Sequence, residues 1–67
     1  MKFKLEIDLE NDAFTTYFEN VRSAEQVARV LQEVVLAVLS AGELSTDDTS
    51  DVRDTNGNTV GRWAVEE

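Results

Sequence analysis

Apolar and polar residues alternate strictly along the first ten residues of the chain. The apolar side carries Phe3, Leu5, Ile7 and Leu9, and the polar side carries Lys2, Lys4, Glu6, Asp8 and Glu10. Such alternation is typical of a strand with one face buried and the other in water. It predicts a strand over residues 2–10, which the turn-forming pair Asn11 and Asp12 brings to an end.

Residues 13–21 fit two structures. Their aromatic and β-branched residues would suit a short strand that pairs with the first. They would equally suit an irregular connection in which Phe14 and Phe18 fill the core. We favour the connection, and the strand is the alternative.

Apolar residues at helical spacing run from Ala24 to Ala41 and predict an amphipathic helix. Ser23 and Gln26 match a capping box, in which the Ser side chain accepts from the Gln amide and the Gln side chain reaches back. Gly42 follows as a left-handed C-cap. The apolar arc covers roughly 200°, against the ~100° that facing one core requires. Part of this arc is therefore available to another chain.

A hairpin is predicted around Asn56-Gly57, because both residues of a tight type I′ turn need positive φ. A two-residue loop would pair Val52 with Gly61. A three-residue loop with a Gly bulge would pair Val52 with Val60 instead. The preceding residues, 43–51, lack periodicity and predict an acidic loop.

We choose the two-residue loop because it puts the only tryptophan, Trp63, and Val65 together on a buried face. It also sets Asp51 opposite Arg62. In this arrangement Leu31, Val34 and Trp63 are core residues. The complete prediction is a single α+β domain over residues 1–67, with β-α-β-β order and one amphipathic helix on a three-stranded antiparallel sheet.

Composition narrows the function. The chain has no His and no Cys, which removes thiol nucleophiles, imidazole bases, disulfides and zinc ligands, so we expect no enzyme and no cofactor. The alternating oxygen ligands Asp54, Asn56 and Asn58 resemble the start of a calcium loop. Such a loop needs Gly at its sixth position and Glu at its twelfth, where this chain has Thr59 and Val65, so we expect no metal site.

Charge and hydropathy set the expected partners. Six basic residues against fourteen acidic ones give a net charge of −8, which opposes direct contact with nucleic acid and favours a protein partner with a basic surface. The first residues mix charge with apolar side chains, so neither a secretory leader nor a membrane segment is expected, and a cytoplasmic location is the default.

Three stretches resemble a group of short uncharacterised proteins from bacteria, phages and mobile elements. They are Asn11-Asp12-Ala13-Phe14, Val27-Ala28-Arg29-Val30-Leu31 and the hairpin stretch from Arg53 to Gly61. The resemblance implies no activity or site. It implies a context, that of accessory proteins of mobile elements, some of which antagonise host defence.

Two functional hypotheses follow. In the first, the chain is an accessory binding protein that acts through an acidic surface, as a nucleic-acid mimic or as an inhibitor of a host restriction or CRISPR protein with a basic groove. Its contact residues would be Asp47, Asp48, Asp51, Asp54, Glu6, Asp8 and Glu10. In the second, it is a structural or oligomeric domain, such as a homodimer, that uses its apolar helix face with Leu36 and Tyr17.

Overall fold

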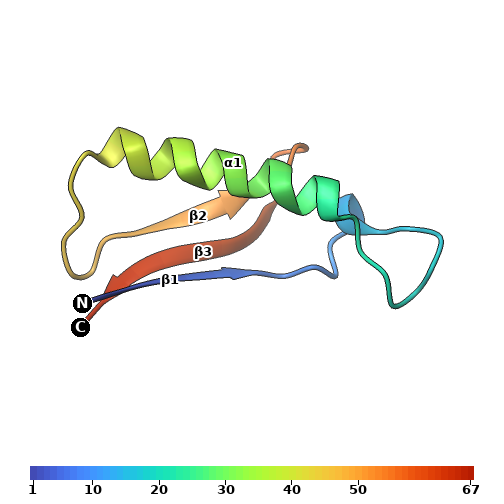
Figure 1. Cartoon of the computed structure of the whole chain (residues 1–67), viewed down its shortest axis with the longest axis horizontal. Helices are drawn as coiled ribbons and strands as arrows, with labels where there is room; N and C mark the ends of the chain where they lie inside the picture. Colours follow the sequence, from blue (N-terminus) through green and yellow to red (C-terminus); the bar gives the residue numbers. More distant parts are fainter.

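The computed structural model describes all 67 residues and has two layers, one helix above a three-stranded sheet (Figure 1). The elements in chain order are β1 (Lys2–Ile7), the 3₁₀ helix η1 (Asp12–Phe14), α1 (Ala24–Ala41), β2 (Thr49–Arg53) and β3 (Thr59–Glu66). The sheet order is β1-β3-β2, and both pairings are antiparallel. The predicted α+β class, with one helix and three antiparallel strands, is confirmed.

Strand β1 is shorter than predicted. It ends at Ile7, because the side chain of Asp8 accepts a hydrogen bond from the amide of Glu10 at 2.9 Å and turns the chain. Before that turn, Asp8 donates its own amide to the carbonyl of Val60 at 2.7 Å. The last three residues of the predicted strand therefore lead into the connection.

The register of β2 on β3 pairs Val52 with Gly61 and Asp51 with Arg62, which confirms the first of the two predicted registers. A β-bulge then breaks the pattern, since Arg53 pairs with Thr59 and leaves one extra residue on β3. The extra residue reverses which face the following side chains occupy. Val60 and Trp63, three positions apart, are consequently both buried in the same core.

The hairpin loop is wider than predicted, and the two-residue turn was wrong. Only Gly57 has a positive φ, 84°, and Asn56 does not. The carboxylate of Asp54 explains the difference, because its Oδ1 accepts from the amides of Asn56 at 2.8 Å and of Asn58 at 2.9 Å. These bonds hold an open loop from residue 54 to residue 58 that Asn-Gly alone does not specify.

Both ends of α1 lie where the sequence places them. The Ser23 side chain accepts from the amide of Gln26 at 3.3 Å, and Gly42 closes the helix with φ 75°. The other half of the capping box is absent, because the Ser23 amide donates instead to the carbonyl of Phe14 at 2.8 Å. That bond ties the start of α1 to η1.

The segment between β1 and α1 is a connection, as favoured, and not a strand. Its only β-type contact is an isolated bridge between Thr15 and Arg22. Phe14 at the end of η1 is 0% exposed and is part of the core, as predicted. Phe18 is 69% exposed, so its predicted place in the core was wrong.

The core is formed by Phe14, Val30, Val34, Val52, Val60, Trp63 and Val65. Leu31 does not belong to it: this side chain is 39% exposed, and Val30 faces the sheet in its place. The reason is the position of α1, which packs against β2 and η1 and not across β1. The helix is rotated toward the β2 side, and one flank of its apolar arc is left without a strand beneath it.

Candidate interaction surface

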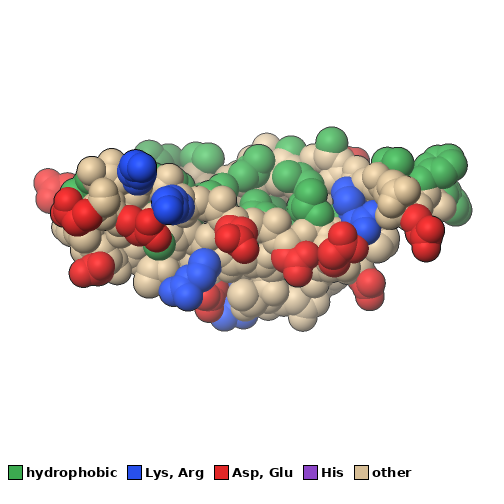
Figure 2. All heavy atoms as spheres, turned by 90° about the horizontal axis from the view of Figure 1, so that it is seen from below, with side chains coloured by type: hydrophobic (Ala, Val, Ile, Leu, Met, Phe, Trp, Pro, Cys, Tyr) green, Lys and Arg blue, Asp and Glu red, His purple; other side chains and the backbone are tan.

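Two apolar faces remain exposed on the side of the molecule that carries the helix. One is the flank of α1 formed by Leu31, Val35 and Leu39, and the other is the helix side of β1, formed by Phe3 and Leu5. We call these five residues together the apolar surface. In Figure 2, hydrophobic side chains gather along the upper long side and at the right-hand end of the molecule, and charged side chains are spread over the middle, the lower side and the left-hand end.

Helical geometry explains why this flank lies toward β1. The other flank, with Arg29, Glu33 and Ala37, lines a groove beside β2. At about 100° per residue, Leu31, Val35 and Leu39 project from the side of the buried Val34 that faces away from this groove. Because β1 is at the opposite edge of the sheet from β2, the exposed leucines and valine lie on the β1 side of the helix.

On β1, the same face is only partly covered. Phe3 stacks on Trp63 with ring centroids 5.4 Å apart, and the register pairs Leu5 with Trp63. These contacts add to the burial of Trp63, which is 5% exposed. Both β1 side chains nevertheless stay open to solvent. The wide apolar arc and the strictly amphipathic first strand were the signals of this surface in the sequence.

The outer face of the sheet, away from the helix, is not acidic. Strand alternation places Lys2, Lys4, Arg53 and Arg62 on this face, with Glu6, Asp51 and Glu66 among them. Lys4 and Glu66 form a salt bridge of 3.0 Å. Four of the six basic residues therefore lie here and balance the acids of the same face.

The predicted acidic contact residues do not form one cluster. Asp47 and Asp48 lie at the end of the molecule where the amide of Asp47 donates to Val65, whereas Asp8 lies beside Val60 toward the other end. The molecule is about 40 Å long. Glu6 and Asp51 flank Arg62 from either side in the register of the sheet.

Several of these carboxylates already have partners within the chain. Glu10 makes a salt bridge of 2.7 Å with Arg22, and Asp48 accepts from the amide of Ser45 at 2.8 Å. Asp54 is 7% exposed and holds the hairpin loop, so its role is structural and it does not present a charge to a partner. Tertiary pairing of this kind is not visible in the spacing of acids along the sequence.

The predicted oligomer contacts, Leu36 and Tyr17, are both exposed. Leu36 lies on the side of α1 roughly opposite the buried Val34, next to Leu39 and at the margin of the apolar surface. Tyr17 lies in the connection at the far end of the molecule, with Phe18 and Val21 also exposed. The structure therefore places Leu36 near the apolar surface and Tyr17 apart from Leu36.

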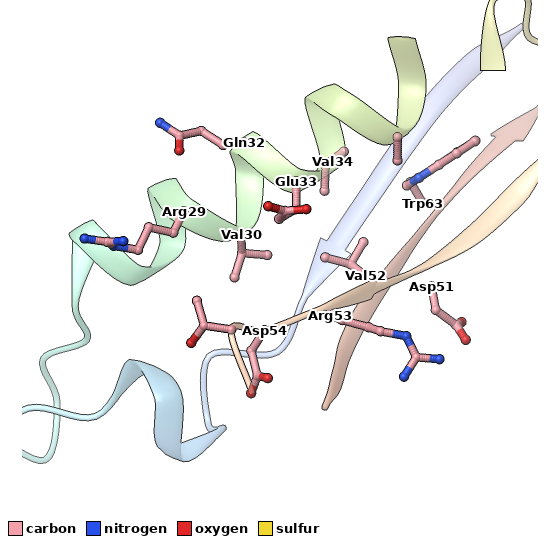
Figure 3. A pocket seen from close by; sticks show the side chains of 12 residues that line it. Arg29, Val30, Gln32, Glu33, Val34, Asp51, Val52, Arg53, Asp54 and Trp63 are labelled. Carbon is pink, nitrogen blue, oxygen red and sulfur yellow. The ribbon is translucent and has the colours of Figure 1, made fainter. Parts of the chain in front are cut away.

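The groove between α1 and β2, about 580 Å³, was not expected from the sequence (Figure 3). Its polar side chains do not converge. Arg29 and Gln32 extend outward from the helix, Arg53 and Asp51 extend from the far side of β2, and the Asp54 carboxylate points away from the helix into its own turn. The groove lacks the convergent polar groups by which a small-molecule site fixes its ligand.

No group of three or more acidic side chains is placed to hold a metal ion. No helix has both the length and the apolar composition that a membrane span requires. Comparisons with family models, curated proteins and solved structures found no match. The case for a function therefore rests on the exposed surfaces.

Proposed function

We propose that this protein is a non-catalytic protein-interaction domain that binds its partner through the apolar surface. The observation that supports the proposal is the exposed flank of α1, Leu31, Val35 and Leu39, beside the uncovered face of β1. Large apolar side chains gathered on one side are a feature of interaction sites, because exposing them together to water is unfavourable. The catalytic alternative has no His, no Cys and no convergent polar groups to support it.

A photo-crosslinking amino acid at Val35 tests this proposal in cells that produce the protein. We expect a covalent adduct with a partner from Val35, and none from Glu33, which lies on the opposite flank of the same helix. Adding Leu39→Glu should abolish the adduct, because a carboxylate would be forced into an apolar contact. The matched control is Ser40→Glu. It adds the same charge at the next residue of α1, which lies on the opposite flank with Glu33.

Leu39 and Val35 are exposed in the isolated chain, so we expect Leu39→Glu to change the free energy of unfolding by less than ~0.5 kcal/mol. Loss of the adduct would then report on the contact and not on folding. An adduct that forms from Glu33 but not from Val35 would move the interaction to the groove and contradict the proposal.

The second candidate function is the acidic-surface binder, an inhibitor or nucleic-acid mimic directed at a basic-grooved host protein. One observation favours it: four of the six basic residues are gathered on the outer face of the sheet, so the rest of the surface carries only Arg22 and Arg29 against most of the fourteen acids. An uneven field of this kind steers a basic partner toward the acidic parts of the surface.

Replacing Asp47, Asp48 and Asp51 together by Asn tests the acidic surface. If the acids bind a basic partner, association should slow and its dependence on ionic strength should flatten. Stability should change little, because Asp47 and Asp51 are exposed and Asn keeps an oxygen that can accept from the Ser45 amide in place of Asp48. Stopped-flow measurements with the crosslinked partner would show the slower association. Leu36→Glu is the control that damages an apolar contact only. An unchanged rate and salt slope in the triple variant would reject the acidic surface.

A further inference from the structure

The outer edge of β1 is the part of the sheet that is most open to pairing. β1 is an edge strand of six residues, it has no bulge against β3, and the chain contains no proline. Edge strands of this kind are templates for another strand, and natural sheets protect them with charges, bulges or covering elements. The opposite edge strand, β2, is shorter, with five residues, and it packs against α1, whose Arg29 and Glu33 line the groove between them.

The backbone of β1 presents a defined set of free groups at this edge. Asp8 donates its amide to Val60 on β3, and peptide groups alternate in direction along a strand. The even-numbered residues therefore direct their peptide groups toward β3. The peptide groups of Phe3, Leu5 and Ile7 point to the free edge.

We propose that the free edge of β1 pairs antiparallel with β1 of a second copy of this chain, with Leu5 opposite Leu5 of the partner subunit. The charge pattern of the strand is the reason. In this register Lys4 lies opposite the partner's Glu6, and Lys2 lies toward the partner's Asp8, the residue just beyond the end of its β1. Each pair occurs twice because the arrangement is two-fold symmetric. Opposite charges facing each other across strands stabilise the pairing, and like charges destabilise it.

The neighbouring registers lack this complementarity. Sliding the strands by two residues keeps every side chain on its face, but it brings Lys4 opposite Lys4 of the partner subunit in one direction and Glu6 opposite Glu6 of the partner subunit in the other. A slip by one residue would turn apolar side chains to the charged face. The sequence of β1 therefore specifies one self-pairing register.

The backbone is compatible with the same register. Leu5, Phe3 and Ile7 are the residues whose peptide groups are free, and they face one another as hydrogen-bonded pairs, with about six bonds between the chains. The charged residues form the alternate pairs, whose side chains approach each other more closely. The product is a continuous six-stranded sheet with both helices on one side. This goes beyond the proposed function, because the copy occupies the edge of β1 and leaves the helix flank of the apolar surface, Leu31, Val35 and Leu39, open.

Charge-swap variants test the pairing. Sedimentation equilibrium should show a dimer for the native protein. The dimer dissociation constant should rise by roughly tenfold or more in Lys4→Glu and in Glu6→Lys, because each substitution creates two like-charge pairs across the interface. An equal mixture of the two variants should recover the dimer, since positions 4 and 6 of one chain are then both acidic and face two lysines of the other. Native mass spectrometry with one variant isotopically labelled should find the mixed dimer only.

The matched controls are Arg29→Glu and Glu25→Lys, which change the net charge by the same amounts. These two residues form an exposed salt bridge of 3.0 Å on α1, away from β1. Both should dimerise as the native protein does. Each swap on β1 also disturbs an intrachain neighbour, such as Glu66 beside Lys4, but that bridge is exposed and contributes little to stability. Recovery of the dimer in the mixture would itself show that both variants fold.

Hydrogen exchange distinguishes this dimer from any other. The amides of Phe3, Leu5 and Ile7 should exchange slowly in the native dimer and rapidly in Lys4→Glu, whereas those of Lys4, Glu6 and Asp8 should be protected in both. A native protein that sediments as a 7.5 kDa monomer at millimolar concentration would overturn the proposal. So would a dimer in which the three edge amides exchange rapidly, or a mixture that stays monomeric.

These outcomes are separate from those that test the proposed function. A monomer that still forms the Val35 adduct with another protein would remove the self-pairing and leave the apolar surface as an interaction site. If the mixture of Lys4→Glu and Glu6→Lys forms the dimer but Val35 gives no adduct, the self-pairing would stand and the apolar surface would be rejected as the interaction site. A dimer dissociated by Leu39→Glu but not by Lys4→Glu would assign the second copy to the apolar surface and reject the β1 edge.

Discussion

Gly61→Ala is expected to prevent the sheet from forming. Gly61 lies where β3 passes β1, and a Cβ at this position would overlap the backbone carbonyl oxygen of Glu6 and lie 2.9 Å from the Cα of Ile7. Backbone atoms cannot rotate away as a flexible side chain can, so β1 would have to separate from β3. A domain of this length has a total stability of roughly 3–10 kcal/mol. The free energy lost with the β1–β3 pairing, and with the contacts of Phe3 and Leu5 on Trp63, should be as large as most of this total stability.

Far-ultraviolet circular dichroism and thermal melting would measure the effect. The control is Gly57→Ala, because Gly57 needs its positive φ of 84° but has open space around its Cα. That substitution should cost ~1–2 kcal/mol and lower the melting temperature while the protein stays folded. If Gly61→Ala melted at the temperature of Gly57→Ala or above, the close approach of β3 to β1 would be disproved.

Phe14→Ala should destabilise the protein by ~3–5 kcal/mol, because it removes a fully buried aromatic ring and leaves a cavity. Phe14 is the only large side chain that is wholly buried, and it belongs to a short 3₁₀ helix whose other support is a few local hydrogen bonds. Its loss would free both η1 and the start of α1, since the Phe14 carbonyl accepts from Ser23. Urea denaturation monitored by Trp63 fluorescence would give the change in free energy.

Phe18→Ala is the matched control for Phe14→Ala. The two residues have the same side chain, lie four positions apart and fit the same sequence pattern, but Phe18 is 69% exposed. We expect Phe18→Ala to shift the free energy of unfolding by less than ~0.5 kcal/mol. Equal effects of the two substitutions would mean that the connection packs differently from the structure.

The sequence predicts best those features that depend on local chemistry. The limits of α1 follow from Ser23 and Gly42, whose roles in capping need no knowledge of the rest of the chain. The pairing of Val52 with Gly61 follows from the requirement that Trp63 be buried. In each case a single physical requirement, a satisfied backbone group or a buried ring, selects one arrangement.

Features that depend on the relative position of whole elements are not predictable in the same way. Leu31 and Val30 both fit the apolar arc of α1, and only the placement of the helix over β2 decides that Val30 is buried. Asp54 resembles a surface acid until the loop closes around its carboxylate. The same applies to the candidate site: the width of the arc predicts an open apolar flank, but the uncovered face of β1 beside it follows from the strand order.

That strand order also constrains how the chain folds during synthesis. Of the five elements, β1 is synthesised first, and β3, its only strand partner among them, is synthesised last. While the ribosome adds the residues between them, the edges of β1 and its apolar side chains Phe3 and Leu5 have no strand to pair with. Closing this long-range contact is slow compared with forming local ones. The sheet is therefore completed only after β3 has emerged, and until then β1 is the segment of the nascent chain most exposed to mispairing with other chains.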